Sequence, residues 1–207
     1  MDTEIPEKKN FLSFVKSNSK TIISIVSILI LFFVTYIWFD NNKKKRNIKV
    51  SEDFINAKIL LEEGKDHEAK NQLEKIINKR NSVYSPLSLF LIIDKDLESN
   101  NSVIINNFDV ILSITTLDDE DTNLIKLKKA IFISESSNEQ EILKLLNPVI
   151  NSNSVWKLQS AKFLGDFYFS LKQFKKAKEY YSIIINENTE DLDINEIKRR
   201  VNTIDNE

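Results

Sequence analysis

Apolar residues recur at intervals of three and four from Ser51 to the end of the chain, with few turn-forming residues between them. This spacing places apolar side chains on one face of a helix. Short clusters of Asn, Ser and Asp separate the apolar segments, as is typical of loops. The pattern predicts an all-α domain over residues 51–207, built from consecutive helices.

A different pattern covers residues 21–39, TIISIVSILILFFVTYIWF, where 19 residues pass without a charged side chain. As a helix this run reaches about 28 Å, close to the roughly 30 Å hydrocarbon core of a bilayer. Its hydroxyls, such as that of Thr35, can bond to a backbone carbonyl one turn earlier. The run predicts a transmembrane helix with these anchor residues: Ile22, Ile25, Ile28, Leu31, Phe32, Tyr36 and Trp38.

The alternative for this run is a cleaved signal peptide, whose apolar region usually spans about 7 to 15 residues and ends at small residues. Here the run is longer and ends in Tyr-Ile-Trp-Phe. Aromatic rings at the end of a span favour the headgroup level of a membrane. We therefore expect the segment to remain in the protein as an anchor.

Polar and basic segments flank the predicted span. Residues 1–20 are predicted to be an N-terminal tail with a short interfacial helix, because Phe11, Phe14 and Val15 fall at helical spacing. Residues 40–50 are predicted to be a basic juxtamembrane linker that touches anionic headgroups. Four Lys precede the span and five Lys or Arg follow it. This margin slightly favours a cytoplasmic C-terminal side but does not decide the topology.

The helical domain divides into hairpins. The first covers residues 51–79, with Ser51 as the N-cap and Gly64 at the turn, where a left-handed backbone favours glycine. Further helices are predicted at 82–97, 102–114, 119–134 and 138–147. Pro148 is expected to close the last of these, because proline disrupts a helix interior. A capping helix is expected at 192–204, with Arg199 and Arg200 exposed.

The fourth hairpin, residues 154–187, has the most specific sequence. Small, Leu-Gly and Tyr positions on its first helix are followed by Ala and an aromatic residue on its second, as in tetratricopeptide repeats. Ala57 and Ala69 show the same spacing of 12 as Gly165 and Ala177. The predicted repeat-packing residues are Ala57, Gly64, Ala69, Leu164, Gly165, Tyr168, Ala177 and Tyr181.

Ala69 and Ala177 lie 108 positions apart, three steps of 36 against about 34 in this repeat family. Four repeats plus the capping helix therefore fit the length. The middle two are degenerate, with Val103 and Ile142 near the expected Ala and Asn107 at an aromatic site. A generic helical bundle remains the alternative fold.

Composition narrows the function classes. Nine of the 29 Lys and Arg and four of the 31 Asp and Glu precede residue 51, which leaves a formal charge of −7 for residues 51–207. An acidic domain is unsuited to binding nucleic acid. Two glycines are too few for a phosphate-binding loop, and the absence of cysteine excludes disulfides and thiolate metal sites.

Catalytic chemistry has few candidates. His67 is the only histidine, so neither a two-histidine metal site nor a Ser-His-Asp arrangement can form, and we interpret it as a surface residue. The acidic run 118–121 lacks the ligand spacing of a calcium loop and is expected to cap the following helix. We predict no catalytic, cofactor or metal residues and no small-molecule substrate. An enzyme of unrecognised type remains a remote alternative.

Aromatic residues are dense in the fourth hairpin, and most are expected to be packing residues. One or two could line a peptide-holding groove of the kind that helical repeats expose. The cluster comprises Trp156, Phe163, Phe167, Tyr168, Phe169, Phe174, Tyr180 and Tyr181. The sequence does not single out which residues would bind a partner.

The order of segments resembles the YfgM-type family. The resemblance rests on KKNFLSFVKSNSK before the span, the aromatic end of the span, EGKDHEAKNQLEKII, SVYSPLSLFLIIDKDLESNN and VWKLQSAKFLGDFYFSLKQFKKAKEYY. Members resemble ancillary subunits of the bacterial SecYEG translocon. The chain departs from the family pattern in the dense KKKR that follows the span.

The resemblance implies a non-enzymatic scaffold in the bacterial inner membrane. It implies a single-pass chain with a cytoplasmic N-terminus and a periplasmic repeat domain. The implied partners are the lipid bilayer, the SecYEG translocon, periplasmic chaperones and secreted proteins. A single-span adaptor for another envelope complex is the alternative within the same class.

Overall fold

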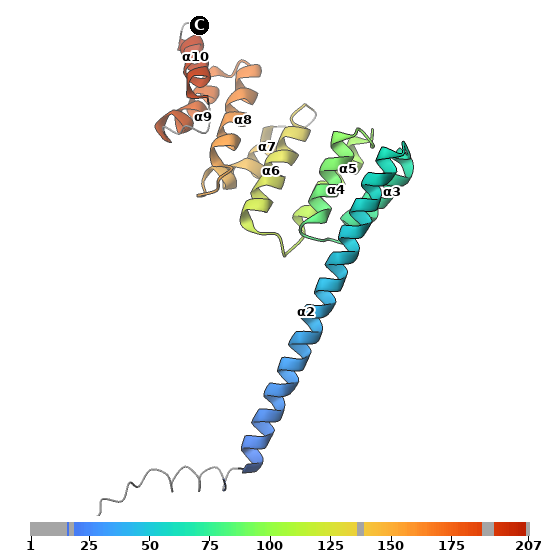
Figure 1. Ribbon diagram of the computed structural model, residues 1–207. Coiled ribbons are helices and arrows are strands. Elements are labelled where there is room, and N and C mark those ends of the chain that lie inside the picture. Colours follow the sequence, from blue (N-terminus) through green and yellow to red (C-terminus); the bar gives the residue numbers. More distant parts are fainter. Residues whose placement is uncertain (1–15, 17–18, 136–138, 188–192, 206–207) are drawn as a thin grey trace, which may run out of the picture. The chain divides into compact units, whose positions relative to one another are not determined.

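The computed structural model describes residues 16, 19–135, 139–187 and 193–205. Within these ranges the chain forms helices and no strands, so the all-α prediction is confirmed for this part (Figure 1). The interfacial helix expected within residues 1–20 lies outside the described residues, apart from Lys16, Ser19 and Lys20. The chain divides into two compact units, Met1–Glu52 and Asp53–Glu207.

The longest element is α2 (Ser19–Glu62), a helix of 44 residues. The expected helix start at Ser51 is therefore wrong, and residues 40–50 are helical. No Gly or Pro interrupts this segment, and Asp40 pairs with Lys44 one turn later at 2.8 Å. Once a helix has formed, each added residue gains a backbone hydrogen bond at low cost, so the helix propagates through the basic segment.

In the part of the chain that the structure describes, none of the helices has an apolar stretch of the length needed to cross a bilayer.

Eight further helices follow α2 in the described residues. They are α3 (Asp66–Asn78), α4 (Tyr84–Asp94), α5 (Asn101–Leu112), α6 (Asp119–Ile133), α7 (Glu139–Ile150), α8 (Lys157–Ser170), α9 (Phe174–Glu187) and α10 (Ile194–Asp205). From α3 onward each helix packs against the next one in sequence. The second unit is therefore a helical repeat-like array, whose helices follow one another in chain order (Figure 1).

A common register relates all four hairpins. Buried pairs 12 positions apart occur at Ala57 and Ala69, at Ile92 and Ile104, at Ala130 and Ile142, and at Gly165 and Ala177. Ile142 lies 73 positions after Ala69 and 35 before Ala177, close to two steps and one step of the same repeat. The third hairpin is thus less degenerate than its sequence suggests, because apolar Ile142 replaces alanine without breaking the register.

The second hairpin keeps this register with larger residues at both positions. Ile92 and Ile104 lie 35 positions after Ala57 and Ala69, and both are buried. Val103, near which the sequence analysis expected the small residue, is one position away and only half-buried. The second hairpin therefore packs in the same register as the other three, with isoleucine in place of both small residues.

Pro148 does not end its helix, contrary to the expectation. It lies inside α7, which continues to Ile150. A proline removes one backbone hydrogen bond, and this loss is small near the end of a helix. Val149 and Ile150 are buried and hold the last turn in place. Asn151 then donates its backbone N–H to Asn147 at 3.1 Å, so the turn closes around the proline.

The first turn of the second unit fits the expectation for Gly64. Its φ of +74° lies in the left-handed region, and no atom would contact a Cβ placed there. The backbone N–H of Lys65 bonds to the carbonyl of Leu60 at 2.8 Å and satisfies the end of α2. This turn reverses the chain so that Ala57 and Ala69 both lie in the core.

Candidate interaction surfaces

The largest exposed apolar surface belongs to α2 in the first unit. Each of the large apolar and aromatic side chains from Ile28 to Phe39 is at least 50% exposed, including the predicted anchor residues Ile28, Leu31, Phe32, Tyr36 and Trp38. The side chains of Ile22 and Ile25 lie outside the described part of the structure. Apolar residues cover the whole circumference of this helix, so no single face is reserved for packing on the rest of the chain.

Polar groups within this surface are satisfied by the helix itself. The Thr35 hydroxyl bonds to the carbonyls of Leu31 and Phe32, each at 2.9 Å, as expected for a hydroxyl in an apolar helix. An apolar surface of this extent marks a site that contacts a membrane or another protein.

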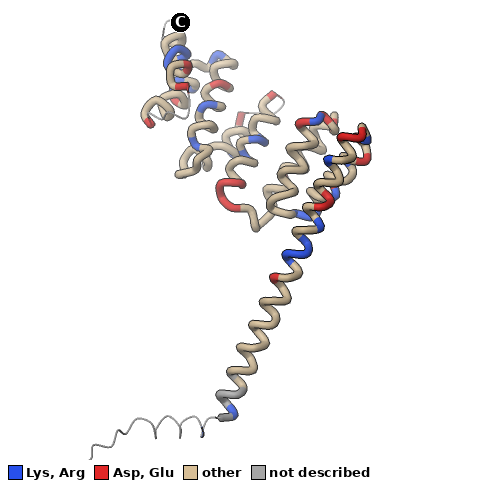
Figure 2. The backbone as a smooth tube through the Cα atoms, viewed as in Figure 1, with Lys and Arg blue, Asp and Glu red and all other residues tan. Residues whose placement is uncertain are grey.

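Basic residues follow the apolar stretch directly. Figure 2 shows Lys and Arg gathered on α2 after the long uncharged segment, with one acidic residue just before them. That acid, Asp40, pairs with Lys44. In the first unit, α2 is therefore apolar on all sides, with aromatic rings at the end of the apolar stretch and basic residues after them.

The second unit has its most distinctive packing between α8 and α9. Leu164, Tyr168, Ala177 and Tyr181 are all buried. A Cβ placed on Gly165 would lie 2.4 Å from Cε1 of Tyr181, far inside van der Waals contact. Only glycine at this position lets the Tyr181 ring cross the helix at this distance.

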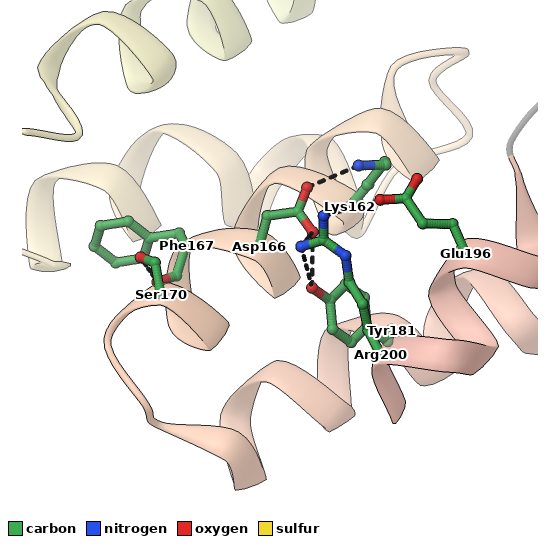
Figure 3. A network of polar contacts seen from close by, with 7 residues as sticks. All are labelled: Lys162, Asp166, Phe167, Ser170, Tyr181, Glu196 and Arg200. Carbon is green, nitrogen blue, oxygen red and sulfur yellow. Dashed lines mark hydrogen bonds and ion pairs between the residues drawn. The ribbon is translucent and has the colours of Figure 1, made fainter. Parts of the chain in front are cut away.

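Asp166 is the centre of a polar network beside this contact (Figure 3). Its Oδ1 accepts hydrogen bonds from the Tyr181 hydroxyl at 2.7 Å and from Nη1 of Arg200 at 2.9 Å, and its Oδ2 accepts one from Lys162 at 2.7 Å. Arg200 also bonds Glu196 one turn earlier at 2.9 Å. Burial, reinforced by the bond to Asp166, raises the pKa of Tyr181 far above its usual range. The network therefore fastens α10 to the last hairpin.

The expectation that Arg200 is exposed is wrong, whereas Arg199 is exposed. Ile197 is buried and fixes the orientation of α10. Arg200 lies three positions later on the same face of the helix, so it points toward α8. Leu192, the expected start of the capping helix, lies outside the described residues.

A second network joins α7 to the last hairpin. Oε1 of Glu139 accepts hydrogen bonds from the Tyr168 hydroxyl and from Lys176, each at 2.7 Å. Nζ of Lys176 lies 4.9 Å from the centre of the Tyr168 ring, which in turn stacks on Tyr180 at 5.6 Å. The bond from Lys176, together with that from Tyr168, lowers the pKa of the Glu139 carboxyl.

We expect Glu139→Gln to lower the free energy of unfolding at about pH 7 by about 0.5 kcal/mol, a value that allows for solvent screening of this half-exposed pair. Because folding lowers the Glu139 pKa, the stabilisation is present above the ordinary value of 4.5 and disappears as the pH falls through the folded value. The deficit should therefore vanish at about pH 3. Urea unfolding at both pH values measures it.

Glu62→Gln, which removes an exposed carboxylate of α2, is the matched control and should leave stability unchanged at both pH values. A deficit of equal size at both pH values would contradict an electrostatic role for Glu139.

The remaining aromatic residues of the fourth hairpin are half-buried packing residues. Phe163 stacks on Phe167 at 6.4 Å, and Phe169 meets Phe174 edge-on at 5.6 Å. Trp156 also packs against the core. Exposed apolar side chains elsewhere in the second unit include Val155 at 74% exposed, Leu171, and two pairs that are four positions apart, Ile55 with Ile59 and Val83 with Leu87. No partner-binding groove is defined by these residues, and the peptide groove stays a prediction.

The residues considered for chemistry have structural roles. His67 is exposed, as interpreted from the sequence. The Asp118 carboxylate accepts the backbone N–H of Asp121 at 2.7 Å, which confirms that the acidic run caps α6. Glu120 of the same run accepts a hydrogen bond from the Ser154 hydroxyl at 2.7 Å. Within the described ranges no group of His, Asp and Glu is arranged to hold a metal ion.

A comparison of the chain with protein families, curated proteins and solved structures gives no match.

Proposed function

We propose that the chain is a non-enzymatic scaffold, held in a membrane by residues 21–39, that presents a helical-repeat domain to partner proteins. The observation that carries the proposal is the exposure of apolar side chains around the whole of α2 from residue 26 to 39. A partner protein would cover one face of a helix, whereas a bilayer covers all faces at once.

The flanks of the run support a bilayer as its environment. Thr21, Ile22, Ile23 and Ile25 extend the run to 19 uncharged residues, although their side chains lie outside the described part of the structure. Tyr36 and Trp38 lie at one end, and the basic residues begin at Lys43, five positions after Trp38. Aromatic rings and then cations are the order found at a membrane interface.

The second unit supports the interaction role. Its consecutive packed helices and the shared register of its four hairpins are compatible with tetratricopeptide-like repeats. Such arrays bind peptides or proteins along an extended surface. Two polar networks fasten the last hairpin to α7 and α10, which gives that end of the array a fixed shape.

The resemblance to the YfgM-type family makes the proposal more specific. We infer an ancillary subunit of the SecYEG translocon in the bacterial inner membrane, with periplasmic repeats that contact chaperones and secreted proteins. The basic segment after α2's apolar run does not oppose this topology, because large domains translocate despite flanking charge.

Site-specific photocrosslinking tests the proposed partners. A photoreactive residue at Leu31, which is exposed in the apolar run, should capture translocon subunits, and one at Val155 should capture chaperones or secreted proteins. A photoreactive residue at buried Leu164 is the matched control and should capture nothing. If Leu31 captures subunits of a different envelope complex, the translocon assignment fails and the adaptor alternative takes its place.

A further inference from the structure

A shallow groove runs along α2 from the end of the apolar run into the basic segment. It is lined by Trp38, Phe39, Asn42, Lys45, Arg46 and Lys49. These positions recur at three and four, so they share one face of the helix. The two rings and the three cations are exposed. The groove is therefore apolar at one end and positively charged at the other.

The acids nearest to this basic groove are paired elsewhere or lie at its far end. Asp40 pairs with Lys44 at 2.8 Å, and Glu52 and Asp53 follow one turn after Lys49, where Asp53 pairs with Lys79. With 3.6 residues per turn, Asp40 lies about 160° around the helix from the middle of the groove. Within the described ranges, Lys45, Arg46 and Lys49 form no ion pair.

The direction of the side chains brings the cations toward the rings. Helical side chains lean toward the N-terminus of their helix, which here is the side of Trp38. Lys45 lies about 10 Å beyond Trp38 along the axis, and its lean shortens this distance. The interfacial region of one leaflet is roughly 5 to 8 Å thick. With Trp38 at the hydrocarbon boundary, the charged groups of Lys45 and Arg46 reach the level of the lipid phosphates, and Lys49, about 16 Å beyond Trp38 along the axis, lies on the aqueous side of them.

We propose that the basic groove binds the headgroup of an anionic phospholipid, an inference that rests on the proposed membrane anchor. Lys45, Arg46 and Lys49 attract the headgroup phosphate, whose negative charge no cation of the same headgroup offsets, with the planar fork of Arg46 suited to two phosphate oxygens. Trp38 and Phe39 contact the upper part of the acyl chains. The ligand is a bilayer lipid, because the groove presents apolar rings and then cations, in the order in which a lipid presents its acyl chains and its headgroup.

Fluorescence quenching by labelled lipids tests the proposal. The chain has two tryptophans, so Trp156→Phe leaves Trp38 as the reporter. The full chain is placed in phosphatidylcholine vesicles that contain a small, equal fraction of spin-labelled phosphatidylglycerol or spin-labelled phosphatidylcholine. We expect the labelled phosphatidylglycerol to quench Trp38 several-fold more strongly. Arg46→Gln with Lys49→Gln should reduce this preference until the two labelled lipids quench Trp38 almost equally, because each cation near the surface contributes to the attraction of anionic lipid.

Lys43→Gln with Lys44→Gln is the matched control, because it removes the same charge from outside the groove and should keep most of the preference. Equal quenching by both labelled lipids in the unmodified groove would overturn the proposal and leave the anchor intact. Equal loss in both double variants would also overturn it, because the preference would then reflect overall charge. An absence of quenching by either lipid would overturn the anchor and the groove together.

Discussion

Ile30→Arg combined with Leu31→Arg should release the chain from the membrane. The two positions lie in the middle of the 19-residue run, and the side chains of both are exposed. Each arginine at the centre of a span costs about 2.5 to 3.5 kcal/mol on insertion scales, so the pair opposes insertion by about 6 kcal/mol. Extraction of cell membranes with alkaline carbonate, followed by immunodetection in pellet and supernatant, measures the change.

The matched control places two arginines outside the run, as Asn41→Arg with Ile48→Arg. It adds the same charge to exposed positions of the same helix and should leave the chain in the membrane pellet. If the Ile30 and Leu31 variant stayed in the pellet as fully as the control, residues 21–39 would not be the anchor.

Gly165→Ala should lower the free energy of unfolding of the repeat domain by about 2 kcal/mol. The new methyl group would lie 2.4 Å from the Tyr181 ring, which is fully buried and held by Asp166. Overpacking costs about 1 to 3 kcal/mol. Alanine gains about 1 kcal/mol in helix propensity, which offsets only part of a clash this severe. Urea unfolding of the chain lacking residues 1–39, followed by circular dichroism, measures the difference.

A double-mutant cycle isolates the cause. Tyr181→Ala alone should cost about 3 to 5 kcal/mol through the cavity it leaves. In that background Gly165→Ala should be neutral or stabilising, because the ring it would meet is absent. An undiminished cost of Gly165→Ala in the Tyr181→Ala background would show that the close approach of ring and helix is not what requires glycine.

Helices and their faces could be predicted from the sequence because apolar periodicity is a local property. The first and fourth hairpins were identifiable from Ala57, Ala69, Gly165 and Ala177, all of which lie in the core. The third hairpin shares their spacing of 12, and Ala130 is the small residue from which its register could have been recognised. It was predicted only as a degenerate repeat because branched aliphatic residues, Ile133 and Leu146, take the places of the two tyrosines.

Helix ends were less predictable. Arg80, Asp96 and Lys172 have positive φ values at the ends of α3, α4 and α8, where glycine would have been the local signal. The surrounding packing holds these residues in a backbone conformation that their own side chains disfavour. Conversely, the dense charge after the apolar run suggested a linker, although the segment contains no helix breaker and α2 continues through it.

The polar networks could not be predicted, because they join residues far apart in the chain. Arg200 and Asp166 are separated by 34 positions, and Lys176 and Glu139 by 37. Each residue alone resembles an ordinary surface charge. Their pairing depends on how α7, α8, α9 and α10 pack, which periodicity does not determine.

Fusion of a topology reporter after Glu207 tests the central claim most directly. Alkaline phosphatase is active only after export from the cytoplasm, so its activity requires both a membrane-inserted anchor and a periplasmic repeat domain. The proposed scaffold predicts an active, membrane-bound phosphatase in the full chain and an inactive one when residues 1–39 are deleted. An inactive phosphatase in the full chain, together with fluorescence of a green fluorescent protein fused at the same position, would place the repeat domain in the cytoplasm and contradict the account.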